Sequence, residues 1–181
     1  MQPFTEMSDD EAQRFMDGDR YPSPEDVAHA VAGRSVLDCG CGKGKKVKEN
    51  YTVCRYLGVD CSAALVRIAR NDNPGFRFEV CELADYLKRL PDKVVPVSVM
   101  VAVLEHLPSL EVAQYLVREA LRVSEELIIG WHTPPKHNRT EIKIVRAELD
   151  RPIWQNHYSR AAFPACPVTK VEGGELWSLR H

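Results

Sequence analysis

The sequence predicts an α/β fold: a doubly wound, mostly parallel seven-stranded sheet with helices on both faces and an antiparallel hairpin at one edge. Two observations predict this fold. From Ser35 onward, short apolar runs alternate with helical segments, and strands separated in this way pair in parallel through right-handed crossovers. Near the C-terminus, Gly173-Gly174 separates two strand-like runs, which is typical of a tight hairpin.

The individual elements follow from the hydrophobic periodicity along the chain. The expected strands are Ser35–Asp38, Arg55–Asp60, Phe76–Val80, Val94–Val103, Glu126–Gly130, Val168–Glu172 and Glu175–Leu179. The expected helices are Lys43–Asn50, Ala63–Arg70, Leu83–Leu90, Leu110–Val123 and Ser159–Ala165. Pro96 lacks the N–H that a central strand needs, so the fourth strand is expected to start after it, at Val97. Trp131 to His157 is expected to be a long irregular segment, and such loops usually carry function.

Residues 1–34 are expected to form a helical arm that precedes the main domain, residues 35–181. Ser8 is expected to cap a helix that runs to about Asp17, and a second short helix begins at Pro24. Two arrangements are open for this arm. It either covers the glycine-rich loop as a lid or packs on the side of the sheet.

Charge and composition narrow the classes of partner. The chain has 24 Lys and Arg against 26 Asp and Glu, so no overall positive field attracts nucleic acid or anionic lipid. The basic run Lys43, Lys45, Lys46 and Lys48 lacks interleaved aromatic residues, which favours a solvated helix face over a nucleic-acid site. With no apolar run of about 20 residues and no export signal, we expect a cytoplasmic protein without a membrane partner. The oligomeric state is open.

The six cysteines are expected to be reduced thiols, because no secretory signal accompanies them. Four of them, Cys39, Cys41, Cys61 and Cys81, come at or just after strand ends, where a zinc site is conceivable. However, the chain contains no C-x-x-C pair, and buried cysteine commonly serves as a small hydrophobic residue. We therefore expect no metal.

The segment Asp38-Cys-Gly-Cys-Gly-Lys-Gly44 follows the apolar pair Val36-Leu37 and is expected to be a ligand-binding loop. Its glycines permit a close approach to the backbone. It lacks the G-x-x-x-x-G-K-[ST] pattern of a phosphate loop and the G-x-G-x-x-G spacing of a dinucleotide fingerprint. The Asp38 carboxylate would also repel a pyrophosphate, so a cationic or hydroxyl-rich ligand is favoured.

This segment resembles the first motif, D-x-G-x-G-x-G, of class I S-adenosylmethionine-dependent methyltransferases. Three further segments resemble later motifs of that family in the same order. Asp60 ends an apolar strand, as does the acid that binds the ribose hydroxyls in the family. Glu82-Leu83 resembles the pair that meets the adenine. Leu104-Glu-His-Leu107 resembles the sequence that follows the fourth strand.

The resemblance implies S-adenosyl-L-methionine as the cofactor, in-line transfer of its methyl group, and a small-molecule acceptor. The cofactor-binding residues that it implies are Asp38, Gly40, Cys41, Gly42, Gly44, Asp60, Cys61, Glu82, Leu83, Val101 and His106. No single catalytic residue is assigned, and the candidate bases are His106, His132 and His157. The aromatic and imidazole side chains of Trp131, His132 and the segment Trp154–Ser159 form either an acceptor pocket or ordinary packing.

Two departures from the family pattern keep other functions open. Pro96 stands where many relatives have an aspartate, and Ala102 stands where many have a polar residue at the tip of the fourth strand. The alternative enzyme is a nicotinamide-dependent oxidoreductase, and the alternative outside catalysis is a silent cofactor-binding module. Binding of S-adenosylmethionine, S-adenosylhomocysteine or NAD would distinguish among the three.

Overall fold

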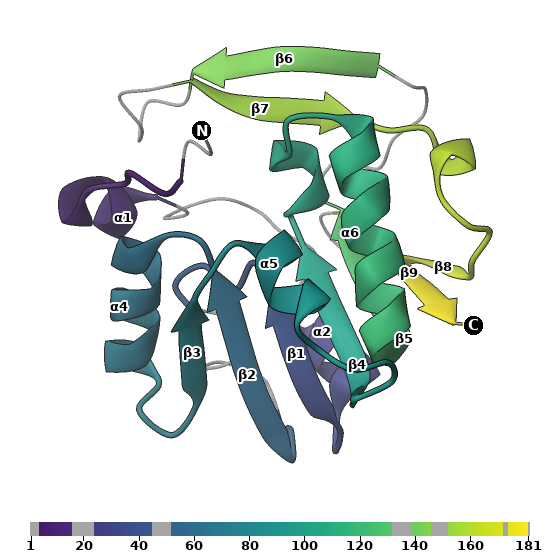
Figure 1. Ribbon diagram of the computed structural model, residues 1–181, viewed down its shortest axis with the longest axis horizontal. Coiled ribbons are helices and arrows are strands. Elements are labelled where there is room, and N and C mark those ends of the chain that lie inside the picture. Colours follow the sequence, from purple (N-terminus) through teal and green to yellow (C-terminus); the bar gives the residue numbers. More distant parts are fainter. Residues whose placement is uncertain are drawn as a thin grey trace.

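A seven-stranded sheet in the order β3-β2-β1-β4-β5-β9-β8 forms the centre of the molecule, as the computed structural model shows (Figure 1). The structure describes residues 4–15, 24–44, 52–131, 139–145, 152–171 and 174–180. The parallel strands are β1 (Ser35–Cys39), β2 (Arg55–Asp60), β3 (Arg77–Val80), β4 (Val95–Val101) and β5 (Ser124–Trp131). Strands β9 (Gly174–Arg180) and β8 (Val168–Val171) complete the sheet in antiparallel orientation. The predicted fold class is confirmed.

Two hydrophobic layers cover the two faces of this sheet. Successive residues of β1, Val36 and Leu37, belong to different core clusters because side chains alternate across a strand. The Val36 face packs against α2 (Pro24–Val31) and α4 (Ala63–Asp72). The Leu37 face packs against α5 (Leu83–Lys88) and α6 (Leu110–Val123). The chain order reverses between β1 and β4, which is where ligands bind in open sheets of this type.

Serine caps set the starting points of the two longest helices. The Ser62 hydroxyl accepts a hydrogen bond from the Leu65 N–H at 3.3 Å and so begins α4. The Ser109 hydroxyl accepts one from the Val112 N–H at 3.4 Å and begins α6, whose bounds agree with the prediction. Such caps satisfy backbone donors that have no partner within the helix.

Helix α1 (Asp9–Arg14) and a hairpin lie beyond the carboxyl ends of the strands (Figure 1). The hairpin consists of β6 (Arg139–Val145) and β7 (Pro152–His157), which pair in antiparallel orientation. Its Ile153 packs with Phe15 and Met7 of the N-terminal segment and with Leu65 of α4. We refer to residues 4–15 and 152–158 together as the roof.

The prediction that Trp131 to His157 is irregular was wrong, because this segment contains β6 and β7. The signal was present in Arg139-Thr-Glu-Ile-Lys-Ile-Val145, where apolar and polar residues alternate as they do in a strand. Prolines disfavour a strand, but Pro152 stands at the first residue of β7, where a proline is tolerated.

Two smaller predictions were also wrong. Instead of a helix over Ser159–Ala165, the structure has a single 3-10 turn, η2 (Arg160–Ala162), because Pro164 disfavours helical backbone at Phe163. Strand β4 begins at Val95 rather than after Pro96. Pairing with β1 starts only at Val97, so the missing N–H of Pro96 removes no hydrogen bond from that ladder.

Some predictions fall where nothing is described. The predicted helix Lys43–Asn50 lies almost wholly outside the described residues. The first predicted helix was expected to run to about Asp17, but α1 ends at Arg14 and Phe15 has extended backbone. In the described part of the chain, no helix is long and apolar enough to cross a membrane.

Candidate functional site

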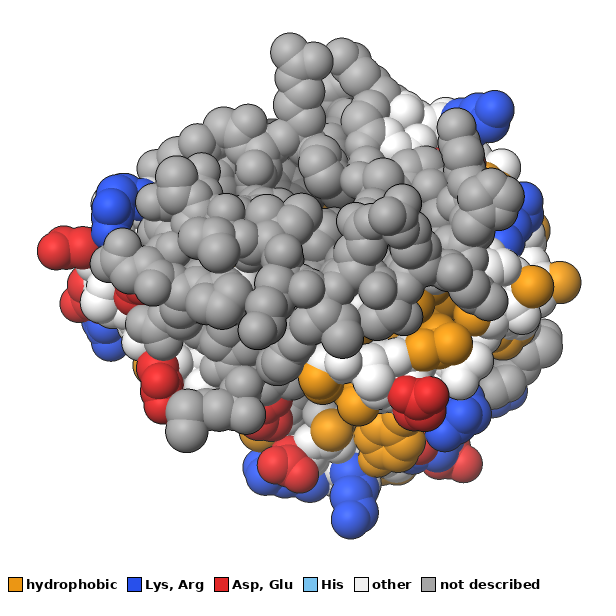
Figure 2. Space-filling model, turned by 90° about the horizontal axis from the view of Figure 1, so that it is seen from above, with side chains coloured by type: hydrophobic (Ala, Val, Ile, Leu, Met, Phe, Trp, Pro, Cys, Tyr) orange, Lys and Arg blue, Asp and Glu red, His pale blue; other side chains and the backbone are white. Residues whose placement is uncertain are grey.

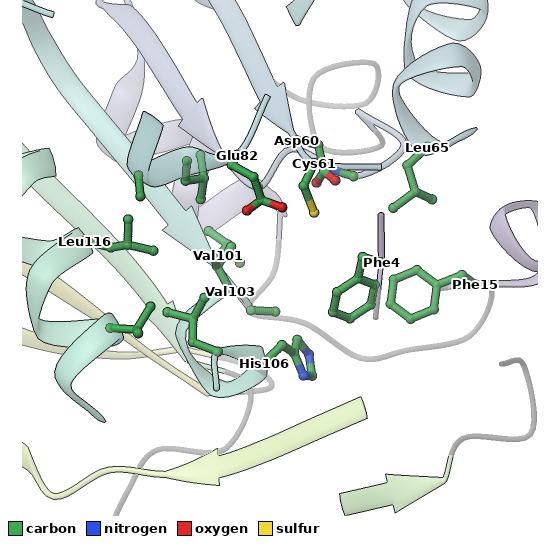
Figure 3. A pocket seen from close by; sticks show the side chains of 17 residues that line it. Phe4, Phe15, Asp60, Cys61, Leu65, Glu82, Val101, Val103, His106 and Leu116 are labelled. Atoms are coloured by element: carbon green, nitrogen blue, oxygen red, sulfur yellow. The ribbon is translucent and has the colours of Figure 1, made fainter. Parts of the chain in front are cut away.

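The candidate site is a pocket at the carboxyl edge of the sheet, next to the switch point between β1 and β4 (Figure 3). Its volume is about 860 Å³, including its open mouth. The structure brings together here the following residues singled out from the sequence: Gly40, Gly42, Asp60, Cys61, Glu82, Leu83, Val101 and His106.

A buried carboxylate connects the glycine loop to the end of β2. Asp60 Oδ2 accepts a hydrogen bond from the Gly42 N–H at 2.9 Å, and Oδ1 accepts one from the Ser62 N–H at 2.9 Å. Each carboxylate oxygen has a second lone pair, and Asp60 lines the pocket. The same side chain therefore fixes the loop and offers two acceptor atoms to a ligand with adjacent hydroxyl groups.

The turn after β1 has room for glycine alone at position 40. Gly40 has a φ of +81°, and a Cβ atom there would lie 2.5 Å from Cγ2 of Val103. Its N–H donates to the Val59 carbonyl at 2.7 Å, which holds the turn against the end of β2. The backbone of the loop consequently forms part of the pocket wall itself.

Two acidic side chains give this end of the pocket its electrostatic character. Glu82 precedes α5 without making a side-chain capping bond, and it extends into the pocket beside Cys61 (Figure 3). Burial raises the pKa of Glu82, and the charge of Asp85 raises it further. Burial also raises the pKa of Asp60, against the opposing effect of its bonds from the Ser62 and Gly42 N–H groups. The pKa of the Cys61 thiol is raised by burial, so it remains protonated at neutral pH.

Three residues that the sequence assigned to the cofactor lie behind the pocket wall. Asp38 is buried, and its Oδ2 accepts a hydrogen bond from the Tyr56 hydroxyl at 2.7 Å. Cys41 is buried in the core layer that contains α4. Gly44 has a φ of +66°, and a Cβ atom there would approach Asn73 and Phe78 at 3.0–3.1 Å. These three residues support the glycine loop from the side of the core.

The cysteines of the glycine loop have a packing role. Cys39 belongs to the core layer that contains α5 and α6, whereas Cys41 belongs to the opposite layer. Burial raises the pKa of Cys39, so its thiol remains neutral. Both residues act as small hydrophobic side chains on opposite faces of the sheet. The described residues include no group of three or more His, Cys, Asp or Glu side chains placed to share a metal ion.

His106 reaches the pocket from η1 (Leu104–His106), the short turn after β4. Its ring meets the edge of Phe4 with centroids 5.8 Å apart. The side-chain amide of Asn156 in β7 donates to the carbonyls on both sides of His106, at 3.3 Å to Glu105 and at 2.6 Å to Leu107. The hairpin thus fixes the backbone that carries this histidine.

The side chains of the other two candidate bases, His132 and His157, lie outside what the structure describes. His132 lies outside the described residues, and the structure describes the backbone of His157 in β7 but not its side chain. The aromatic residues proposed with them are packing residues where they are described. The ring centroids of Trp131 and Trp177 are 5.0 Å apart, with the planes tilted at 58°, in a buried cluster that also holds Tyr158 and Phe163.

Sequence reasoning missed a large apolar part of the lining. The additional lining residues are Phe4, Phe15, Leu65, Ala84, Ala102, Val103, Leu107, Val112 and Leu116. The helical periodicity of α6 identifies Leu116 as buried, but it does not distinguish core from pocket. Nothing local to Phe4 or Phe15 places them at the site, since both depend on where the N-terminal segment docks. Ala102 has a positive φ of 55°, an uncommon conformation for alanine that occurs here at the pocket.

This fold and site define the class: a Rossmann-like domain whose glycine loop and second-strand acid meet at one pocket. The sequence profile of the family described as "Methyltransferase domain" matches residues 36–126, half of the 181-residue chain. The chain belongs to this family, and the resemblance noted in the sequence is confirmed. No curated protein sequence matches the chain.

Solved structures support the same fold. An S-adenosylmethionine-dependent methyltransferase from Methanosarcina mazei superposes with a TM-score of 0.63 at 15% identity, over 84% of this chain and 95% of that one. The DhpI-SAM-HEP complex gives 0.60 at 20% identity, over 86% and 83%. Magnesium protoporphyrin IX methyltransferase from Synechocystis PCC 6803, with bound SAM, gives 0.53 at 18% identity, over 84% and 72%. In three other matched structures the chain covers only 42–49% of the neighbour's own length.

Proposed function

We propose that the protein is an S-adenosylmethionine-dependent methyltransferase that acts on a small-molecule acceptor. The observation that carries the proposal is the Asp60–Gly42 unit, in which a buried carboxylate holds the glycine loop and faces the pocket. The pocket has few charged groups, and Phe4 and Phe15 of the roof cover part of it, which fits a small-molecule site. A nicotinamide cofactor is the alternative ligand for this pocket. A binding measurement with S-adenosylmethionine and NAD distinguishes the two ligands.

The residues at one end of the pocket fit the parts of this cofactor. Asp60 offers acceptor atoms for the two ribose hydroxyls, while Glu82 and Leu83 offer a polar and an apolar contact for the adenine. The Gly40–Gly42 backbone fits the remaining chain of the ligand, because close approach is possible there. When bound, S-adenosylmethionine supplies a sulfonium-activated methyl group, and the electrons of the broken carbon–sulfur bond stay on sulfur.

The protein's own contribution is then chiefly positioning and exclusion of water. Phe4 and Phe15 of the roof cover the pocket from above, and aliphatic residues close the wall toward α6. His106 is the base candidate that reaches the pocket, and it can take a proton from an acceptor hydroxyl or amine during transfer.

The distribution of charge on the surface bears on the kind of partner. In the view from above the roof, the described charged side chains have both signs and are interspersed around the margin (Figure 2). No basic patch gathers among these described side chains, and a local basic patch is what a nucleic-acid site would need. A cytoplasmic location and the division into residues 1–34 and 35–181 remain predictions.

Calorimetry with S-adenosylmethionine, S-adenosylhomocysteine and NAD tests the proposal. We expect both sulfur ligands to bind, and Asp60→Ala to weaken them by about 1–3 kcal/mol because buried hydroxyl partners are lost. Asp72→Ala, at an exposed position of α4, is the matched control and should leave the affinity unchanged. Since Asp60 also holds the loop, Glu82→Gln provides a second variant if Asp60→Ala does not fold. Binding of NAD alone, or of none of the three ligands, would contradict the proposal.

A further inference from the structure

The pocket extends well beyond the residues that fit the cofactor. Its polar end comprises Gly40, Gly42, Asp60, Cys61 and Glu82. The remaining lining is apolar apart from His106. It comes from the roof, the first turns of α4 and α5, the end of β4 with the turn that follows it, and the buried side of α6. In Figure 3, Phe4, Phe15 and His106 lie on one side of this region, and Val103 and Leu116 lie on the other.

Three rings form one wall of this region. The Phe4 and Phe15 centroids are 5.5 Å apart with their planes at 59°, and Phe4 and His106 meet edge to face at 5.8 Å. Tilted and edge-on contacts at these distances are the favourable geometries for aromatic groups, so the wall is suited to a further flat ring. Phe15 is 5% exposed, which shows that the wall is held in place rather than free in solvent.

The roof that carries these rings is attached at several points. Asp9 forms an ion pair with Arg67 of α4, and Ala12 is buried against the same helix. The ammonium group of Lys43, a residue of the glycine loop, donates to the Gln13 carbonyl. The aromatic wall is therefore fixed relative to the loop at the other end of the pocket.

Charge is distributed unevenly over the lining. Asp60 and Glu82 are the acidic groups, and none of the lining residues that the structure describes is lysine or arginine. A carboxylate or phosphate on the acceptor would lose its hydration without gaining a cationic partner, and it would face two acids. A cationic acceptor would also lose its hydration in the apolar region, because both acids lie at the end of the pocket that is left to the cofactor. During methyl transfer it would in addition face the sulfonium.

From these observations we infer that the acceptor is a neutral, flat, largely apolar small molecule with an aromatic ring, bound between the Phe4–Phe15–His106 wall and the aliphatic side chains of Val103, Leu107 and α6. This inference rests on the proposed methyltransferase function, because the polar end of the pocket must be left to the cofactor. It makes Phe4 and Phe15 specificity-determining residues.

Three naphthol probes test the inference in protein saturated with S-adenosylhomocysteine. Calorimetry compares neutral 2-naphthol with the anion 6-hydroxy-2-naphthoate and the cation 6-(aminomethyl)-2-naphthol. We expect 2-naphthol to bind at least roughly tenfold more tightly than either charged probe, since an unpaired buried charge is costly. Equal or tighter binding of a charged probe, or no binding of 2-naphthol, would overturn the acceptor class.

Substitutions locate the binding region. Phe4→Ala should weaken 2-naphthol binding about fivefold or more, because the ring contact and its buried area are lost. Met7→Ala is the matched control, since Met7 packs in the same part of the roof outside the pocket lining, and its effect should be clearly smaller. Equal effects of the two substitutions would mean that the probe does not meet the aromatic wall.

The S-adenosylhomocysteine titration that precedes each experiment separates the two proposals. If this ligand fails to bind, the proposed function fails and the acceptor class fails with it. If it binds while the naphthol probes give the contrary result, the methyltransferase function stands and only the acceptor class is overturned.

Discussion

At the scale of residues, the two carboxyl groups of the pocket, Asp60 and Glu82, differ in how firmly hydrogen bonds hold them. Asp60 is tied by backbone N–H groups on both oxygens, so its position is set before any ligand arrives. Glu82 makes no capping bond to its helix, and its charged form is disfavoured by burial and by Asp85. Preorganised acceptors bind hydroxyl groups with little loss of side-chain freedom.

Glu82→Gln gives a pH-dependent prediction. The raised pKa of Glu82 means that the folded protein retains a proton that the unfolded chain releases above the ordinary value of 4.5. Stability from this group therefore falls as pH rises through the window between the two values. We expect the variant to be more stable than the parent at pH 7, by no more than about 0.5 kcal/mol because solvent screens this partly exposed group, with no difference at pH 3.5. Urea unfolding at both pH values measures this, and a difference that grows toward acid pH would contradict it.

Gly40→Ala tests the close contact at the turn after β1. The added Cβ would meet Val103 at 2.5 Å on a backbone with positive φ, so we expect a loss of about 2–4 kcal/mol in unfolding free energy. Gly33→Ala is the matched control, because Gly33 also has a positive φ, of +70°, but has no neighbour within 4 Å of the new atom. It should cost only about 1–2 kcal/mol. Chemical denaturation compares the two, and equal losses would mean that Val103 yields to the new atom.

At the scale of elements, the β6–β7 hairpin is connected to the site through η1. Asn156 is 2% exposed and bonds the carbonyls of Glu105 and Leu107, residues about 50 positions earlier in the chain. Tyr158, just after β7, donates to the Ser109 carbonyl at 3.5 Å at the start of α6. The hairpin therefore supports the turn that carries His106 from the side opposite the sheet.

Asn156→Ala should lower the unfolding free energy by about 1–3 kcal/mol, because two carbonyls lose a donor in a buried place. It should also change the environment of His106, seen as a shift of its imidazole NMR signals. Gln114→Ala is the control, since Gln114 donates in a similar way to the Ala162 carbonyl, at 2.6 Å, away from the pocket lining. If both variants leave the His106 signals unchanged, the hairpin does not set the position of this histidine.

Strands β1 to β3 and helices α4, α5 and α6 were predicted well because their signals are local. Examples are the Ser62 and Ser109 caps, the apolar stripe of α6 and the glycines after β1. The β6–β7 hairpin was not predicted, although apolar and polar residues alternate in β6. Prolines lie on both sides of β6, and proline is typical of irregular segments. The docking of Phe4 on His106 joins residues about 100 positions apart, and no pattern near either residue encodes it.

At the scale of the whole molecule, one carboxylate joins three segments at the end of the sheet opposite the pocket. Glu126 of β5 accepts hydrogen bonds from Arg34, which precedes β1, at 2.7 Å and from Arg180, near the end of β9, at 3.1 Å. Ser178 donates to it as well. Burial alone would raise the pKa of Glu126, but these bonds outweigh burial and hold the pKa below its ordinary value.

Glu126→Gln should therefore destabilise the protein at pH 7 by about 1–3 kcal/mol. A depressed pKa gives stability that is present above the ordinary value of 4.5 and is lost as pH falls through the folded value. The difference between parent and variant should shrink in acid, in thermal or urea unfolding between pH 7 and pH 3. Glu125→Gln, at the exposed neighbouring position, is the control. A deficit that persists unchanged at pH 3 would show that the charge is not responsible.

The origin of the roof has a consequence for evolution. Phe4, Phe15, Ile153 and Asn156 all lie outside residues 36–126, the part of the chain that the methyltransferase family shares. Insertions or exchanges in these outer segments leave the hydrogen bonds of Asp60 to the glycine loop intact, since both partners lie within the shared part. Changes in the roof can therefore alter which molecules fit the pocket, while the contact between Asp60 and the glycine loop stays the same.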